Sequence, residues 1–180
     1  MTTKLAARGA LLALLACLAP GCGGGSPPGA SSAETGGARP PDFELSTLDG
    51  KTVRLSDHLG KDVVLIDFWA TFCDPCLASM PHLDELYKKH KDKGFVVLGV
   101  SIDGPDSIAQ VKSTVQKLGV SFPILLDQET SVVALYNPKT SAPYSVLIGR
   151  DGSVLTKKEG YTTGDSTAVD RDVEAALAKK

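Results

Sequence analysis

The chain has 180 residues, enough for one globular domain with short appendages. Its formal net charge is −2, and this acidity argues against a nucleic-acid-binding protein. There is no glycine-rich phosphate-binding loop and no internal repeat, so the four cysteines are the first place to look for chemistry.

Residues 1–21 have the pattern of a secretory signal. Lys4 and Arg8 give a positive start, and the apolar run that follows is far shorter than the roughly 20 residues of a membrane-spanning helix. Gly21-Cys22 resembles the lipidation site of bacterial lipoproteins, and we expect Cys22 to carry the lipid. Cys17 is the competing residue, but its preceding apolar run is short for such a signal. Cleavage without lipidation is the other alternative.

Residues 22–40 are mostly Gly, Pro and Ser and contain almost no large apolar side chain. Because such a segment cannot bury apolar surface, we expect a flexible tether. These features predict a membrane-attached lipoprotein whose domain, residues 41–180, faces the periplasm or the cell exterior. Loss of the signal removes two positive charges and leaves the mature chain more acidic.

The first half of the domain contains three predicted elements. Asp49-Gly50, within residues 41–61, is a strong hairpin turn between two short strands. Residues 63–70, V-V-L-I-D-F-W-A, form a continuous β-rich run that predicts a central strand buried on both faces. From Cys76 onward the spacing is helical, and the apolar residues on one stripe are Leu77, Met80, Leu83, Leu86 and Tyr87.

The second half alternates strand-like and helix-like segments. Its predicted elements are a strand at 95–102, a helix at 105–118, a strand at 122–126, a helix at 129–136, strands at 144–148 and 154–159 around Arg150-Asp151-Gly152, and a helix at 164–178. The order predicts one α/β domain with a central mixed sheet flanked by helices.

Cys73 and Cys76 lie at the predicted junction of the buried strand and the helix. The free backbone N–H groups at a helix start favour negative charge, so Cys73 can be held as a thiolate, the form that attacks disulfides. Pro75 presets φ where no N–H is needed. Asp74 either opposes the thiolate through its charge or acts only as a favourable first-turn acid.

Two other uses of this cysteine spacing compete with redox chemistry. A zinc site needs two further ligands, while Cys17 and Cys22 lie in the predicted signal region. The histidines are not paired at ligand spacing; they are His58, His82 and His90. A purely structural disulfide over so short a loop would stabilise the fold very little. We therefore expect no metal and no cofactor apart from a redox-active Cys73–Cys76 disulfide.

Residues 65–76, L-I-D-F-W-A-T-F-C-D-P-C, resemble the active-site segment of thioredoxin. The pattern W-A-T-x-C-x-P-C at 69–76 is closer still to the membrane-tethered TlpA/ResA-like thiol-disulfide oxidoreductases, and the similarity covers most of residues 40–178. Residues 41–61 resemble the N-terminal hairpin that this family shares with the peroxiredoxins of the AhpC/TSA type. The resemblance implies a thioredoxin-like fold with that hairpin as an extension.

The resemblance also implies roles for individual residues. Cys73 would attack and Cys76 would resolve the mixed disulfide. Asp67 matches a buried aspartate of thioredoxin, whose raised pKa suits it to accept the proton of Cys76. TlpA-like relatives often have another residue at this position. The alternative is that Asp67 is a strand-end carboxylate that reaches water. The stretch S-A-P-Y-S-V-L-I at 141–148 places Pro143 as a cis-proline against the sulfurs.

We expect a substrate-binding surface around the two cysteines. The backbone of Ala142 would pair with an extended substrate peptide, although relatives commonly have a β-branched residue there. Phe72 replaces the tryptophan of most relatives and keeps an apolar rim. The residues expected on this surface are Trp69, Phe72, Asp74, Pro75 and Ala142.

The implied function is thiol-disulfide exchange with protein substrates outside the cytoplasm. We expect a monomeric reductant, for example in cytochrome c maturation, that receives electrons from a membrane partner of thiol type. A peroxidase of the peroxiredoxin kind is one alternative, but it needs a hydroxyl donor at position 70, which is Ala70; Thr71 is one residue too late. Metal or haem delivery is another, but copper chaperones on this fold use a late histidine, and none follows His90.

Overall fold

The computed structural model describes residues 38–162 and 164–179. The predicted signal, Cys17, Cys22 and the tether up to residue 37 lie outside the described residues. The described chain is already packed at its start, since Pro40 is buried and Val154 N donates to Ala38 O at 3.3 Å. Within the described ranges, no helix is long and apolar enough to cross a membrane.

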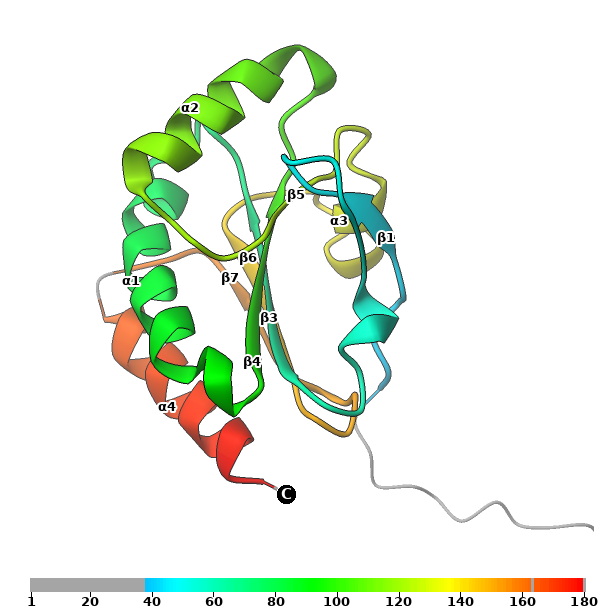
Figure 1. Ribbon diagram of the computed structural model, residues 1–180, viewed down its shortest axis with the longest axis vertical. Helices are drawn as coiled ribbons and strands as arrows, with labels where there is room; N and C mark the ends of the chain where they lie inside the picture. The colour runs from blue at the N-terminus through cyan, green and yellow to red at the C-terminus, as the bar shows by residue number, and fades with distance from the viewer. Residues whose placement is uncertain (1–37, 163, 180) are drawn as a thin grey trace, which may run out of the picture. The chain divides into compact units, whose positions relative to one another are not determined.

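A five-stranded mixed sheet forms the centre of the fold, in the order β5-β4-β3-β6-β7 (Figure 1). Strands β3 (Val63–Trp69), β4 (Phe95–Ser101) and β5 (Ile124–Leu126) run parallel. Strands β6 (Tyr144–Ile148) and β7 (Val154–Glu159) complete the sheet in antiparallel pairs. All seven residues of β3 are buried, as its unbroken apolar run predicts for a strand covered on both faces.

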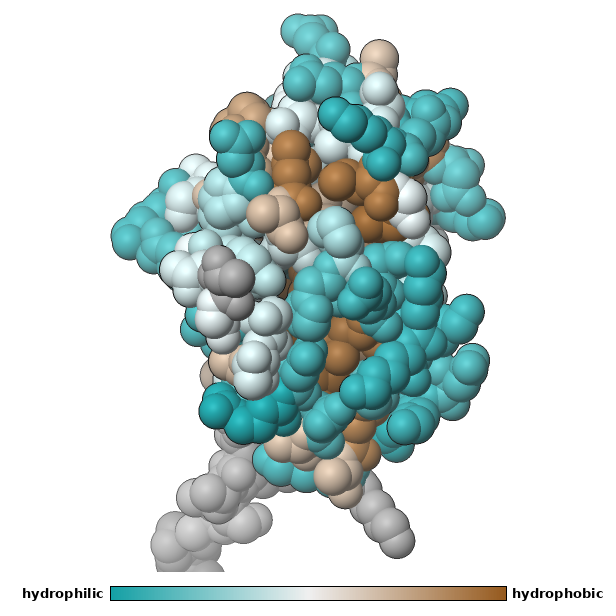
Figure 2. All heavy atoms as spheres, turned by 90° about the vertical axis from the view of Figure 1, so that its left-hand side faces the viewer, coloured by the Kyte–Doolittle hydropathy of each residue, from teal (hydrophilic) through white to brown (hydrophobic). Residues whose placement is uncertain are grey.

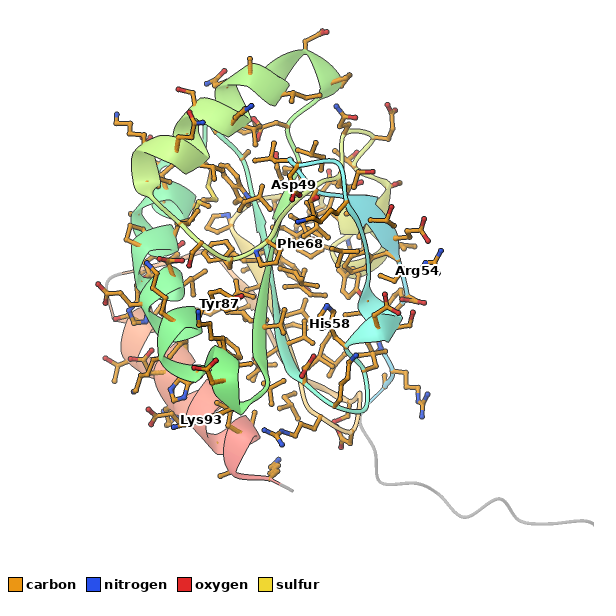
Figure 3. The ribbon with its side chains drawn as sticks, in the orientation of Figure 1. Asp49, Arg54, His58, Phe68, Tyr87 and Lys93 are labelled. Atoms are coloured by element: carbon orange, nitrogen blue, oxygen red, sulfur yellow. A yellow bond between two sulfur atoms is a disulfide. The ribbon has the colours of Figure 1, made fainter. Side chains whose placement is uncertain are left out.

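Helices cover both faces of the sheet, with α1 (Asp74–His90), α2 (Ile108–Leu118) and α4 (Asp165–Ala178) on one side and α3 (Ser131–Tyr136) on the other (Figure 1). Each side has its own apolar core. The core under α1, α2 and α4 includes both cysteines of the redox pair, and Tyr87 packs against it. Phe68 belongs to the opposite core (Figure 3). The predicted α/β architecture is confirmed.

The N-terminal hairpin packs on the α3 side of the sheet. Strands β1 (Glu44–Ser46) and β2 (Thr52–Arg54) pair antiparallel, and Gly50 in the turn has φ +80°, a conformation that suits glycine. Leu48 N donates to Ile124 O at 3.1 Å, which attaches the hairpin to β5. The 3₁₀ turn η1 (Leu55–Asp57) follows and buries Leu55. The predicted extension is present, and it protects an edge strand of the sheet.

Several elements are shorter than the sequence predicts. The helix predicted at 105–118 is divided into a 3₁₀ turn, η3 (Pro105–Ser107), and α2. The predicted strand at 122–126 begins only at Ile124, because Pro123 has no N–H for the ladder. The helix expected from residue 129 begins at Ser131, since Thr130 has a left-handed φ of +53°. A further 3₁₀ turn, η2 (Lys91–Lys93), joins α1 to β4.

The outer face of α1 and α4 is mainly hydrophilic, with hydrophobic side chains visible between the polar ones (Figure 2). Ion pairs join the two helices: Lys89 Nζ lies 2.8 Å from Glu174 Oε1, and His82 Nε2 lies 2.9 Å from Asp170 Oδ1. The exposed Lys89–Glu174 pair contributes little stability. The apolar inner faces of the helices, packed on β3 and β4, hold this layer in place.

Candidate active site

The redox pair sits where β3 ends and α1 begins. Cys73 and Cys76 form a disulfide with an S–S distance of 2.00 Å and a Cα–Cα distance of 5.3 Å. Cys73 is 7% exposed, whereas Cys76 is 0% exposed. A partner can therefore reach only the sulfur of Cys73, which is the geometry expected of an attacking cysteine with a buried resolving cysteine behind it.

The first turn of α1 supplies a backbone donor to the sulfur of Cys73. Cys73 is the N-cap residue, and Cys76 N donates to its Sγ at 3.3 Å. Pro75 occupies the first turn, where its missing N–H costs no helical hydrogen bond. Once the disulfide is reduced, this N–H group and the helix dipole favour a thiolate on Cys73.

Asp67 lies in β3, on the face covered by α1 and α4, and is 5% exposed. Its register partner on β4 is Gly99, and side chains of Phe122 and Ile124 fill the space beside that glycine. Burial alone raises the pKa of Asp67 to about 7. Its Oδ2 has no hydrogen-bond partner in the described chain. This burial agrees with the raised pKa that the sequence predicts, and the role of Asp67 as proton acceptor for Cys76 stays a prediction.

A small cavity of about 20 Å³ adjoins Asp67. Ser79 also lines it, and Ser79 Oγ donates to Cys76 O at 2.8 Å, which places the carboxylate beneath the first turns of α1. Lys158 is the cation on the wall, but its ammonium is paired with Asp165. Asp67 thus has no ion-pair partner among the described residues and faces a water-sized cavity near the turn of α1 that contains Cys76.

Pro143 forms the other wall of this cavity, and the Ala142–Pro143 peptide bond is cis, as predicted. Gly160 N donates to Pro143 O at 2.8 Å, which fixes the loop from its far side. Ala142 packs against the core that contains both cysteines. Its own backbone N–H and C=O take part in no hydrogen bond within the described ranges, so both are available to an extended peptide.

The residues expected on the substrate surface divide into two groups. Phe72 is 78% exposed beside Cys73, and Asp74 and Pro75 are exposed as well. Trp69 is different: it is fully buried in the core under α1, because β3 turns it to the same face as Asp67. The structure therefore does not place Trp69 on the surface that a substrate meets; Trp69 belongs to the same buried core as the two cysteines.

Asp103, which the sequence reasoning missed, contacts the loop before Cys73. Its carboxylate accepts hydrogen bonds from Thr71 N, at 3.0 Å to Oδ2, and from Thr71 Oγ1, at 2.6 Å to Oδ1. One signal for it was available. Asp103 directly follows a buried strand parallel to the one that leads to Cys73, and the carboxyl ends of parallel strands meet at one edge of a sheet.

Each of the three histidines lies near a carboxylate. His58 Nδ1 is 2.9 Å from Asp62 Oδ2, His82 is paired with Asp170, and His90 is 3.8 Å from Glu174 Oε1. Among the residues described, no three or more His, Cys, Asp or Glu side chains form a group that could hold a metal ion.

The accessible Cys73, the buried Cys76, Asp67 and the cis-proline on a thioredoxin-like fold define a thiol-disulfide oxidoreductase. The sequence profile of the AhpC/TSA family matches residues 37–157, and the chain belongs to that family. The thiol-disulfide oxidoreductase ResA of Bacillus cereus is 36% identical over 127 residues, which are 71% of this chain and 71% of that protein. ResA of Geobacillus kaustophilus is 35% identical over 139 residues, or 77% of this chain and 76% of that protein.

A solved structure supports the same assignment. The crystal structure from Chlorobium tepidum, described as a thiol:disulfide interchange protein DsbE, superposes with a TM-score of 0.73 at 34% identity. The match covers 79% of this chain and 98% of that one. The predicted thioredoxin-like fold and the predicted resemblance to ResA-like oxidoreductases are both confirmed.

The burial of Asp67 predicts a pH-dependent loss of stability. Folded Asp67 keeps its proton up to about pH 7, but in the unfolded chain a carboxyl of this kind loses it near pH 4. Stability therefore falls as the pH rises between these values, by up to about 4 kcal/mol. Asp67→Asn cannot ionise, so its free energy of unfolding in urea, relative to the wild type, should rise by that order between pH 4 and pH 8.

The oxidised protein is used for both measurements, and Asp106→Asn, at an exposed site, serves as the matched control. That control should follow the wild type at both pH values. An Asp67→Asn difference that stays constant across the pH range would contradict the assigned pKa.

Proposed function

We propose that this oxidoreductase works outside the cytoplasm as a reductant of protein disulfides, for example those of apocytochrome c. The main observation behind this proposal is that Phe72 is exposed beside the reachable Cys73, while Ala142, which packs against the core containing both cysteines, has an unpaired backbone. An apolar rim and a free strand-like backbone suit an extended polypeptide better than a small thiol. The ResA and DsbE names of its relatives support the same class of reaction.

The catalytic cycle follows from the positions of the two sulfurs and Asp67. The thiolate of Cys73 attacks one sulfur of the substrate disulfide; that S–S bond breaks, and the leaving sulfur takes up a proton. Asp67 accepts the proton of the Cys76 thiol, and Cys76 then attacks Cys73 Sγ and releases the second substrate thiol. Two electrons pass to the substrate and the Cys73–Cys76 disulfide forms. A carboxyl with a pKa of about 7 can accept and return this proton near neutral pH.

The proposed direction rests on Asp74. Its exposed carboxylate lies next in sequence to Cys73, where its charge disfavours the thiolate that the helix start favours. An unstable thiolate raises the free energy of the reduced form, and the pair is then a better electron donor. A membrane partner of thiol type would return the protein to its dithiol form, and attachment through Cys22 would keep the two together.

A peroxidase is not supported by the loop geometry. In the described loop between β3 and Cys73, the hydroxyl of Thr71 donates a hydrogen bond to Asp103 Oδ1 at 2.6 Å. The side chain of Ala70 has no hydroxyl. No hydroxyl donor from this loop is left to polarise a peroxide beside Cys73.

The reduction potential of the Cys73–Cys76 pair tests the direction. Against glutathione or dithiothreitol, we expect a value of about −200 mV or lower, in the range of glutaredoxins and thioredoxin. Asp74→Asn should move the potential toward more oxidising values, because it removes the charge that opposes the thiolate. A wild-type value near about −120 mV, that of a strong oxidant, would refute the reductant assignment.

The roles of the two cysteines are tested separately. Cys73→Ser should abolish the reduction of insulin disulfides, because the reachable sulfur is gone. Cys76→Ser should retain the first attack and accumulate mixed disulfides, seen as adducts on a non-reducing gel. Full turnover in either variant would contradict this mechanism, and so would hydrogen peroxide consumption by the wild type at peroxidase rates.

Lipid attachment is tested with the two N-terminal cysteines as a matched pair. Cys22→Ser should abolish incorporation of labelled fatty acid and release the protein from the membrane fraction, whereas Cys17→Ser should leave both unchanged. The reverse result would assign the lipid to Cys17. If the wild-type protein incorporates no labelled fatty acid, lipidation is excluded.

A further inference from the structure

Asp103 is a buried carboxylate at the carboxyl end of β4, 4% exposed. Besides its contacts with Thr71, it accepts a hydrogen bond from Ser101 Oγ at 2.8 Å. In the part of the chain that the structure describes, no Lys, Arg or His forms an ion pair with it. Removing a carboxylate from water costs free energy, and the hydrogen bonds from Thr71 and Ser101 offset this cost.

The hydrogen bonds of Asp103 act on the turn that leads to Cys73. Thr71 presents both its N–H and its hydroxyl to the carboxylate, and Cys73 N donates to Ala70 O at 3.1 Å within the same turn. At its start, this turn is tied to β4 by Ile102 N, which donates to Trp69 O at 2.9 Å. Asp103 is thus the side chain that connects the approach to Cys73 with the end of β4.

We propose that Asp103 is a positioning residue for the thiol-disulfide reaction. By holding Thr71, it keeps Cys73 at the start of α1, so that Sγ stays close to the N–H of Cys76 when the disulfide opens. The thiolate then forms where the helix start can stabilise it. The proposal rests on the oxidoreductase function. It adds to that function a residue that positions Cys73 without a hydrogen bond to either sulfur.

The chain offers a matched control in Asp127. This carboxylate lies just past the end of the neighbouring parallel strand β5 and is 1% exposed. It accepts hydrogen bonds from Val132 N at 3.2 Å and Val133 N at 2.7 Å, and so caps α3 on the other side of the sheet. Asp127→Asn therefore disturbs a comparable buried carboxylate without touching the turn before Cys73.

The experiment compares Asp103→Asn, Thr71→Val and Asp127→Asn in the full chain. In insulin reduction, kcat/KM should fall about tenfold in Asp103→Asn and about threefold in Thr71→Val, but less than about twofold in Asp127→Asn. Thr71→Val keeps the charge of Asp103 and removes one anchoring bond. The pH midpoint for alkylation of reduced Cys73 by iodoacetamide should therefore rise in this variant, a shift that a loss of stability alone would not produce.

Alkylation is read at Cys73 by peptide mass spectrometry, because the chain has three other cysteines. If Thr71→Val matches the wild type in both readouts while Asp103→Asn does not, the carboxylate acts through its charge and the proposal fails. If Asp127→Asn loses as much activity as Asp103→Asn, the effect is general stability and the proposal also fails. Absence of insulin reduction by the wild type would refute the proposed function instead, while the alkylation profile still tests the positioning.

Discussion

The rest of the site depends on the junction between β3 and α1. A strand buried on both faces cannot shift without disturbing two cores, and it delivers the chain to the first turn of α1 at a fixed place. There the free N–H group of Cys76 donates to the sulfur of Cys73. The rigid strand supplies the position and the helix start supplies the electrostatics. Neither element alone would hold a reachable thiolate.

Asp67 shows what this arrangement costs. A carboxyl in the middle of a central strand is desolvated, and its pKa near 7 means that the ionised form destabilises the folded protein. An apolar residue there would make a more stable core, but it could not take the proton of Cys76. Gly99 on the next strand contributes to the same environment, because Phe122 and Ile124 occupy the space where a β4 side chain would otherwise stand.

Most of the fold was predictable because its signals are local. The apolar run of β3, the Asp49-Gly50 turn and the strand pair at 144–148 and 154–159 appear as predicted. The errors at element ends have local causes that residue patterns do not display, such as the left-handed Thr130 and the capping of α3 by Asp127. Trp69 was misplaced because a motif gives residue spacing, while burial depends on which face of β3 is covered.

The amino-acid sequence by itself determined the chemistry: two cysteines three positions apart at a strand-to-helix junction are enough to predict a redox-active dithiol. Tertiary structure decided which sulfur is reachable and which side chains serve it. Packing buries Cys76 completely, and burial raises the pKa of Asp67. Asp103 accepts a hydrogen bond from Thr71, which lies 32 positions away in the sequence. Exposure, desolvation and long-range hydrogen bonds arise only when separate segments are packed together, so no local pattern could have contained them.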